Sequence, residues 1–182
     1  MTATASDSPD ATSTAAESSA AEEAARPATS SDIHDIVALA AALRTQMSTE
    51  RGGPLWDAHD ALPTATPELL TARLAGNDIA TLVGTLDGAV LAYGFAHTEP
   101  VGSDGLIGVI DELFVLEPAR AVGLGETLLR ALVDWCTEAG ITQGIDATAL
   151  PGDRQAKNFF ESAGFKARRL IMHKPLEPNL RQ

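Results

Sequence analysis

The most constraining feature of this sequence is an apolar segment that runs through a glycine-bearing turn directly into an amphipathic helix. Residues 106–116 are rich in aliphatic side chains and end before Pro118, as expected of a strand. A turn with Gly123 and Gly125 follows, and residues 123–139 repeat leucines at helical spacing. Backbone N–H groups in such a turn converge on one point, and the helix N-terminus adds about half a positive charge. The segment therefore predicts a strand–turn–helix unit that can bind an anion such as a pyrophosphate.

Three phosphate-binding motifs contain a turn of this kind, and two of them do not fit the sequence. A P-loop requires a Gly-Lys-Ser or Gly-Lys-Thr triplet, which the sequence does not contain. A dinucleotide-binding fingerprint requires Gly-x-Gly-x-x-Gly, but Leu128 stands where the third glycine belongs. That mismatch and the short chain argue against a dinucleotide-binding oxidoreductase. The third motif is Arg-x-x-Gly-x-Gly, formed by Arg120, Gly123 and Gly125.

The charge and cysteine content exclude several classes of function. The chain has 182 residues with 25 acidic and 13 basic side chains, a net charge of −12. Such a surface repels nucleic-acid phosphates and anionic lipid headgroups, so we expect no nucleic-acid partner and no membrane partner. The single cysteine, Cys136, cannot form an intrachain disulfide, and its place on the apolar face of a helix predicts a core residue and not a nucleophile. Because there is no Cys/His cluster, we expect no metal site.

The charges are unevenly distributed along the chain. Residues 1–25 carry five acids, no base and no Leu, Ile, Val or aromatic side chain. Such a segment buries too little apolar surface to offset the entropy of ordering its backbone, so we expect a disordered acidic tail and a single domain over 26–182. The tail resembles neither a secretory signal nor a mitochondrial presequence, which predicts a cytoplasmic protein. Nine of the 13 bases follow residue 119, so the first part of the domain is acidic and the last third is basic.

Helix and strand signals alternate along the domain and predict an α/β (α+β) fold with a mixed sheet flanked by helices. Asp87-Gly88 is a strong hairpin signal, and Thr66-Pro67 is typical of a helix start. Ser30 or Ser31 is the expected cap of the first helix. The predicted helices cover 33–47, 67–75, 123–139 and 153–163, the predicted strands cover 79–86, 90–96, 106–116, 141–150 and 165–173 with a weak one near Arg26, and 48–63 is a predicted loop.

The turn and a second segment together resemble the GNAT superfamily of acyl-CoA-dependent N-acyltransferases. The Arg-x-x-Gly-x-Gly turn matches one family motif. Residues 153–165 are similar to the other, which usually reads Asn-x-x-Ala-x-x-Phe-Tyr followed by Gly-Phe. The two motifs cover about residues 106–174. The resemblance implies a mostly antiparallel sheet in one domain and transfer of an acetyl group from acetyl-CoA, as co-substrate, to a primary amine in a ternary complex.

The resemblance also implies where acetyl-CoA binds. Backbone groups of Phe114 and Val115 would pair with the pantetheine arm like an added strand. Lys157 and Asn158, with Arg154 nearby, would meet the ADP end, although a solvated helix face is the alternative for Lys157. The pyrophosphate would be held by the backbone of Arg120, Ala121, Val122, Gly123, Leu124, Gly125 and Glu126.

Amine acylation needs a base for the ammonium proton, and two acids on the central strand are the candidates. Strand alternation places Val109, Asp111, Leu113 and Val115 on one face and Ile110, Glu112 and Phe114 on the other. In the family an acid on the first of these faces commonly lies near the acceptor amine. Asp111 is therefore the first candidate for catalysis and Glu112 the second, with His97 as a further possible base. A structural hydrogen bond is the alternative role for either acid.

The second motif departs from the family pattern at Phe160 and Asp153. Phe160 stands where a tyrosine usually acts as general acid, and Asp153 replaces the usual asparagine. We therefore expect a slow enzyme or another acid, such as Ser162. The alternative function is a non-catalytic acyl-CoA-binding module that serves as a sensor or interaction domain.

The acceptor is less well defined by the sequence. In the family the early helices and loops shape its site, which here means residues 51–56 and their surroundings. Trp56 is either a wall of that site or a plug at the domain edge. The acidic first part of the domain suits a cationic amine such as a polyamine, an aminoglycoside or a lysine side chain. The sequence leaves the oligomeric state open, a homodimer included.

Overall fold

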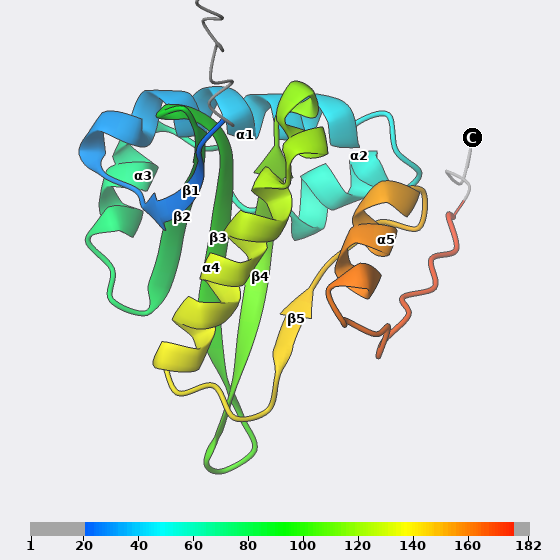
Figure 1. Ribbon diagram of the computed structural model, residues 1–182. Helices are drawn as coiled ribbons and strands as arrows, with labels where there is room; N and C mark the ends of the chain where they lie inside the picture. Colours follow the sequence, from blue (N-terminus) through cyan, green and yellow to red (C-terminus); the bar gives the residue numbers. More distant parts are fainter. Residues whose placement is uncertain (1–20, 177–182) are drawn as a thin grey trace, which may run out of the picture.

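The structure is a computed structural model that describes residues 21–176, and at its centre is one five-stranded sheet (Figure 1). The strands lie in the order β1-β2-β3-β4-β5, with the first four antiparallel and β5 parallel to β4. This confirms the predicted mixed, mostly antiparallel sheet. The strands are β1 (Glu23–Pro27), β2 (Ile79–Leu86), β3 (Ala89–Val101), β4 (Gly105–Val115) and β5 (Ile145–Ala147).

Helices cover both faces of the sheet and create two separate cores (Figure 1). On one face, α4 (Leu124–Glu138) packs its leucines on small and aliphatic side chains such as Ala92, Ala96 and Ile110. On the other, α1 (Ile33–Met47) and α3 (Pro67–Leu74) pack on Val83, Tyr93, Phe95 and Phe114. The last helix, α5 (Arg154–Ser162), lies beside β5. Within residues 21–176 no helix has the length and hydropathy needed to cross a bilayer.

Local signals placed several boundaries correctly. The hairpin between β2 and β3 turns at Asp87 and Gly88, both with positive φ (49° and 81°), as a type I′ turn requires. Thr66 caps α3 by accepting the N–H of Leu69 (3.3 Å), and Pro67 fills the first helical position. These features depend on a few neighbouring residues, so the sequence alone predicts them.

The structure differs from the prediction in three segments. Residues 48–63 are not a plain loop, because Gly52, with φ of 94°, starts the short helix α2 (Gly53–Leu55) and a π-helical turn follows over Trp56–Asp60. The strand predicted over 141–150 shortens to β5. The strand predicted over 165–173 is absent, and Leu170, Ile171 and Met172 are exposed. The three residues of β5 offer too short an edge for a ladder to form.

The predicted boundary at residue 26 is also wrong, because β1 begins at Glu23 and pairs it with Leu86. Strand pairing uses backbone groups, so the edge of β2 can pair with residues 23–25 although their side chains give no strand signal. Residues 1–20 of the predicted acidic tail lie outside the described residues.

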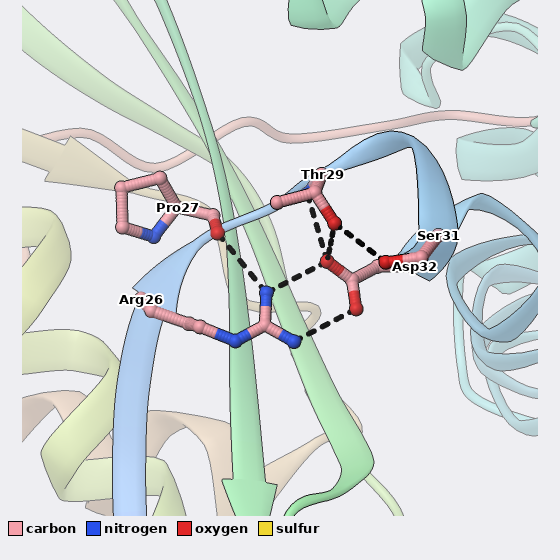
Figure 2. Close-up of polar contacts among 5 residues, drawn as sticks. All are labelled: Arg26, Pro27, Thr29, Ser31 and Asp32. Carbon is pink, nitrogen blue, oxygen red and sulfur yellow. Dashed lines mark hydrogen bonds and ion pairs between the residues drawn. The ribbon is translucent and has the colours of Figure 1, made fainter.

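A buried carboxylate ties the first strand to the first helix (Figure 2). Asp32 is 4% exposed and accepts two hydrogen bonds from the Arg26 guanidinium (2.7 and 2.8 Å). It also accepts the N–H (2.7 Å) and hydroxyl (2.9 Å) of Thr29. The chain therefore enters α1 through a 3₁₀ turn over Ser30–Asp32 that follows Thr29, so the predicted serine cap is wrong.

Replacing Asp32 with Asn should lower the free energy of unfolding by about 2–3 kcal/mol, less than for a fully buried pair because Arg26 is half exposed. The hydrogen bonds from Arg26 and Thr29 lower the pKa of Asp32 well below its usual value, against the opposing effect of burial. Its contribution is therefore complete above about pH 4–5, over the pKa of an unfolded aspartate, and is lost as pH falls further. Denaturant melts of Asp32→Asn at pH 7 measure the loss. Asp35→Asn, on the exposed side of α1, is the control and should change stability by less than about 0.5 kcal/mol.

Candidate active site

One cleft runs along the end of β4, between α1 and α5, and has two parts. The larger part, the turn cavity, has a volume of about 370 Å³ and extends from the end of β4 over the start of α4 to α5. The smaller part, the carboxylate cavity, has a volume of about 70 Å³ and lies beside Asp111, Glu112 and Trp56. Both are lined by Leu113 and Phe160, so the two cavities meet there. The glycine turn and the candidate acids thus lie at opposite ends of one cleft, and Phe160 of the second motif lines both of its parts.

The glycine turn shapes the turn cavity. After the 3₁₀ segment Glu117–Val122, Gly123 takes a φ of 87° and α4 begins at Leu124. A β-carbon on Gly125 would lie 3.3 Å from Phe159 of α5, so the absence of a side chain keeps this part of the cavity open. The N-terminal turn of α4, with its partial positive charge, therefore lies at the cavity wall.

The structure brings only part of the predicted acetyl-CoA set to the cavity. The predicted residues that line it are Phe114, Val115, Arg120, Gly125, Glu126 and Asn158. Ala121, Val122 and Gly123 belong to the turn beside it, and the side chain of Leu124 is buried in the α4 core. Lys157 lies on the exposed side of α5 and pairs with Glu161 (2.7 Å), which favours the solvated-face alternative for its side chain.

Arg120 connects three walls of the turn cavity. Its guanidinium donates to the carbonyl of Val115 (2.8 Å) at the end of β4 and to Gln46 Oε1 (2.6 Å) on α1. It also donates to Gln155 Oε1 (3.2 Å) on α5 and stacks over the ring of Phe114. Gln46 and Gln155 are cavity residues that sequence reasoning missed, because nothing in their local patterns points to Arg120.

A β-bulge decides where the two candidate acids lie. Phe95 of β3 pairs with Glu112, whereas Ala96 pairs with Ile110, so Asp111 is an extra residue in β4. Simple alternation, which separated Asp111 from Glu112, is therefore wrong here. Ile110 faces α4, and both acids lie on the side of α1 and α3, where Glu112 contacts Tyr93 and Asp111 contacts Arg73.

Glu112 is a buried carboxyl in a mostly apolar wall. Glu112 is only 8% exposed, and the hydroxyl of Tyr93 donates a hydrogen bond to its Oε2 (2.7 Å). Burial raises the pKa of Glu112, and the hydrogen bond from Tyr93 and the charge of Arg44 offset only part of that rise. A carboxyl with a raised pKa is a stronger base than one in water, as general base catalysis requires.

Asp111 is held between two basic side chains. His97 Nδ1 lies 2.9 Å from Asp111 Oδ1, and Arg73 Nη2 lies 3.5 Å from Oδ2. Burial lowers the pKa of His97, but the hydrogen bond with Glu99 and the charge of Asp111 outweigh it, so the net pKa is raised. Arg73 also stacks over Phe95, 4.4 Å from the ring centroid. His97 lines neither cavity, so the predicted histidine contacts the site only through Asp111.

The remaining candidates have defined places. Phe160 lines both cavities and packs against Phe159 and Phe165. Ser162 lines the turn cavity, where its hydroxyl donates to the carbonyl of Phe159 (2.7 Å). Asp153 caps α5 by accepting the N–H of Ala156 (2.8 Å). Cys136 is fully buried beneath Gly108, as predicted for a core residue. In the described part of the chain no group of three His, Cys, Asp or Glu side chains is arranged to hold a metal ion.

Comparison with known proteins gives one family and many similar folds. A sequence model of the acetyltransferase (GNAT) family matches residues 46–165. A variant of the BH1408 protein from Bacillus halodurans has a TM-score of 0.71 and 24% identity, over 84% of this chain and 99% of that one. A transcriptional regulator from the same organism has a TM-score of 0.64 and 19% identity, over 84% and 100%. The aminoglycoside N-acetyltransferase AAC(6′)-Iy bound to CoA has a TM-score of 0.66 and 18% identity, over 87% and 97%. At these identities the structures share the fold, and no curated protein sequence matches the chain.

Proposed function

Because the chain belongs to the acetyltransferase (GNAT) family, we propose that it transfers an acetyl group from acetyl-CoA to a primary amine. The observation that carries this proposal is the cleft, in which a helix N-terminus lies at one end and a buried carboxyl at the other. The two cavities meet at Leu113 and Phe160, which is where a thioester in one cavity and an amine in the other would come together. Direct transfer needs no other group between them.

The turn cavity suits the phosphorylated co-substrate. Its volume of about 370 Å³ accommodates part of a long cofactor, and the N-terminal turn of α4 stabilises negative charge. In this proposal the backbone from Arg120 to Glu126 holds the pyrophosphate, and Phe114 and Val115 pair with the pantetheine arm. The side chain of Arg120 positions the cavity walls through Gln46 and Gln155.

At the other end, Glu112 acts as the general base. The structure favours Glu112 over Asp111 for this role, because Asp111 is held by His97 and Arg73, whereas Glu112 has one hydrogen-bond donor, Tyr93, among the described residues. Glu112 takes a proton from the acceptor ammonium, and the freed amine attacks the thioester carbonyl. The C–S bond then breaks and the nitrogen gives up its second proton to water, which leaves the neutral amide and CoA thiolate. Asp111 holds the acceptor side of the site in place through its contacts with His97 and Arg73.

The thiolate leaves without a general acid at position 160, where the family usually has a tyrosine. Phe160 carries no proton, and the Ser162 hydroxyl donates to the carbonyl of Phe159. A thiolate is a tolerable leaving group, so the reaction proceeds without a general acid, but a factor of about 10²–10⁴ in rate is forgone. The presence of Phe160 in place of a proton donor also favours the second candidate function, an acyl-CoA-binding module without catalysis.

Two measurements test the proposal together: calorimetric titration with acetyl-CoA, and thiol release from acetyl-CoA over a panel of primary amines. Binding with amine-dependent release supports the enzyme, and binding without release supports the acyl-CoA-binding module. Failure to bind acetyl-CoA contradicts both.

A variant of Gly125 tests the position of the co-substrate. In Gly125→Val the added methyl groups occupy the turn cavity beside Phe159 and Val115, so we expect the Kd for acetyl-CoA to rise about tenfold or more, roughly 1.4 kcal/mol. Gly140→Asn is the control, because Gly140 ends α4 in open space with a φ of 81°, which asparagine tolerates. Calorimetry on both variants, with thermal melts to confirm folding, measures the change. Equal affinities in the two variants would place the co-substrate elsewhere.

A further inference from the structure

The walls of the carboxylate cavity are mostly apolar. Nine of its thirteen lining residues have apolar side chains, among them Met47 from α1, Trp56 from the π-helical turn and Leu150 beyond β5. Trp56 is itself 7% exposed, so the ring is a fixed wall and not a flexible cover. Hydroxyl or amino groups placed against these walls would lose water without gaining hydrogen bonds, which weakens binding of a polar acceptor.

The acidic side chains of this cavity already have partners. Asp153 is engaged as the cap of α5, and Asp111 faces Arg73 and His97. Glu112 accepts a hydrogen bond from Tyr93. Three acids therefore do not amount to three free negative charges, and the site has the capacity to neutralise one ammonium group, beside Glu112.

The aromatic side chain of this wall is also in contact with a cation. The guanidinium of Arg44 lies over the Trp56 ring, 5.9 Å from its centroid, and forms an ion pair with Asp57. One face of the indole is thus already covered by a guanidinium whose charge is paired with that of Asp57, so this face does not offer a further cation site. Arg44 is held further by the carbonyl of Leu62, so its position is fixed.

From this combination we propose that the acceptor is a monoamine with an apolar body, such as an arylalkyl or alkyl amine, and not a polyamine or an aminoglycoside. The inference rests on the proposed acetyl transfer. The cavity of about 70 Å³ takes the amine and the first carbons attached to it, with the ammonium toward Glu112 and the carbons against Met47 and Trp56. The acidic first part of the domain suggested a cationic amine such as a polyamine, an aminoglycoside or a lysine side chain, but the acids that line this cavity already have partners.

The test compares three amines in steady-state thiol release at saturating acetyl-CoA, with the full chain at one pH. We expect kcat/KM for phenethylamine to exceed that for spermidine and for kanamycin by at least about tenfold. A better rate with spermidine or kanamycin overturns this inference and leaves acetyl transfer intact. If acetyl-CoA binds but none of the amines supports thiol release, the proposed transferase is contradicted, and the inference with it.

A pair of variants tests the wall itself. Trp56→Ala should raise KM for phenethylamine by about tenfold, because it removes the apolar surface that the carbons contact, and should change kcat much less. Leu55→Ala is the matched control, since Leu55 is the preceding residue, is 46% exposed and lines neither cavity. An unchanged acetyl-CoA affinity in both variants shows that the fold is intact. An unchanged KM in Trp56→Ala would overturn the role of this wall.

Discussion

Replacing Glu112 with Gln should lower kcat for amine-dependent thiol release by about 10²–10⁴-fold, the range typical of general base catalysis. Glutamine keeps the shape of the side chain and can still accept the hydrogen bond of Tyr93, but it cannot take a proton. Acetyl-CoA affinity should stay unchanged, because Glu112 lines the carboxylate cavity and not the turn cavity. Steady-state kinetics and calorimetry on the same preparation measure both quantities.

The pH dependence of the reaction gives a second readout of the same carboxyl. Because burial raises the pKa of Glu112 and the base works as the carboxylate, kcat should rise with pH through that raised pKa. The hydrogen bond from Tyr93 lowers the pKa of Glu112, so Tyr93→Phe should move this acid limb to higher pH. Glu138→Gln, at the exposed end of α4, is the control. A Glu112→Gln variant with near-normal kcat and the same acid limb would rule out Glu112 as the base.

Replacing Gly53 with Ala should lower the free energy of unfolding by about 3 kcal/mol or more. A β-carbon at this position would lie 1.7 Å from the carbonyl oxygen of Met47, which is backbone at the end of α1 and cannot rotate away. Either α2 or the end of α1 must shift, and Trp56 would shift with α2. For a chain of this length the loss corresponds to a fall in Tm of about 6–12 °C, measured by thermal melts.

The control for this variant separates steric conflict from the general cost of losing a glycine. Gly102 has no neighbour within 4 Å of a built β-carbon, but has a φ of 64°. Gly102→Ala should therefore cost only the left-handed backbone conformation, about 1–2 kcal/mol. If Gly53→Ala melts no lower than Gly102→Ala, the close packing of α2 against α1 is incorrect.

The parts of the fold that the sequence predicts are those that depend on neighbouring residues. The hairpin at Asp87 and Gly88 and the turn from β4 into α4 each carry their signal within a few positions. The strand predicted over 165–173 had the right local pattern, but a strand also needs an edge to pair with, and β5 is only three residues long. Local pattern alone cannot supply that partner.

The candidate site divides in the same way. The glycine turn and the acid pair are visible in the sequence, whereas the relative orientation of Asp111 and Glu112 depends on how β3 and β4 pair. Gln46 and Gln155 meet Arg120 only because α1 and α5 approach the end of β4. The partners that fix Asp111, from α3 and β3, are likewise brought together by the folded chain.

The bulge in β4 also bears on how such a site can change during evolution. Because Asp111 is the unpaired residue between Ile110 and Glu112, the strand on either side keeps its register with β3 and its contacts with both cores. Gain or loss of one codon at this point would add or remove a carboxylate beside Glu112 without exchanging any core residue. A length change in a central strand, ordinarily among the most damaging of mutations, is here a route by which the chemistry of the site can be altered while the fold is retained.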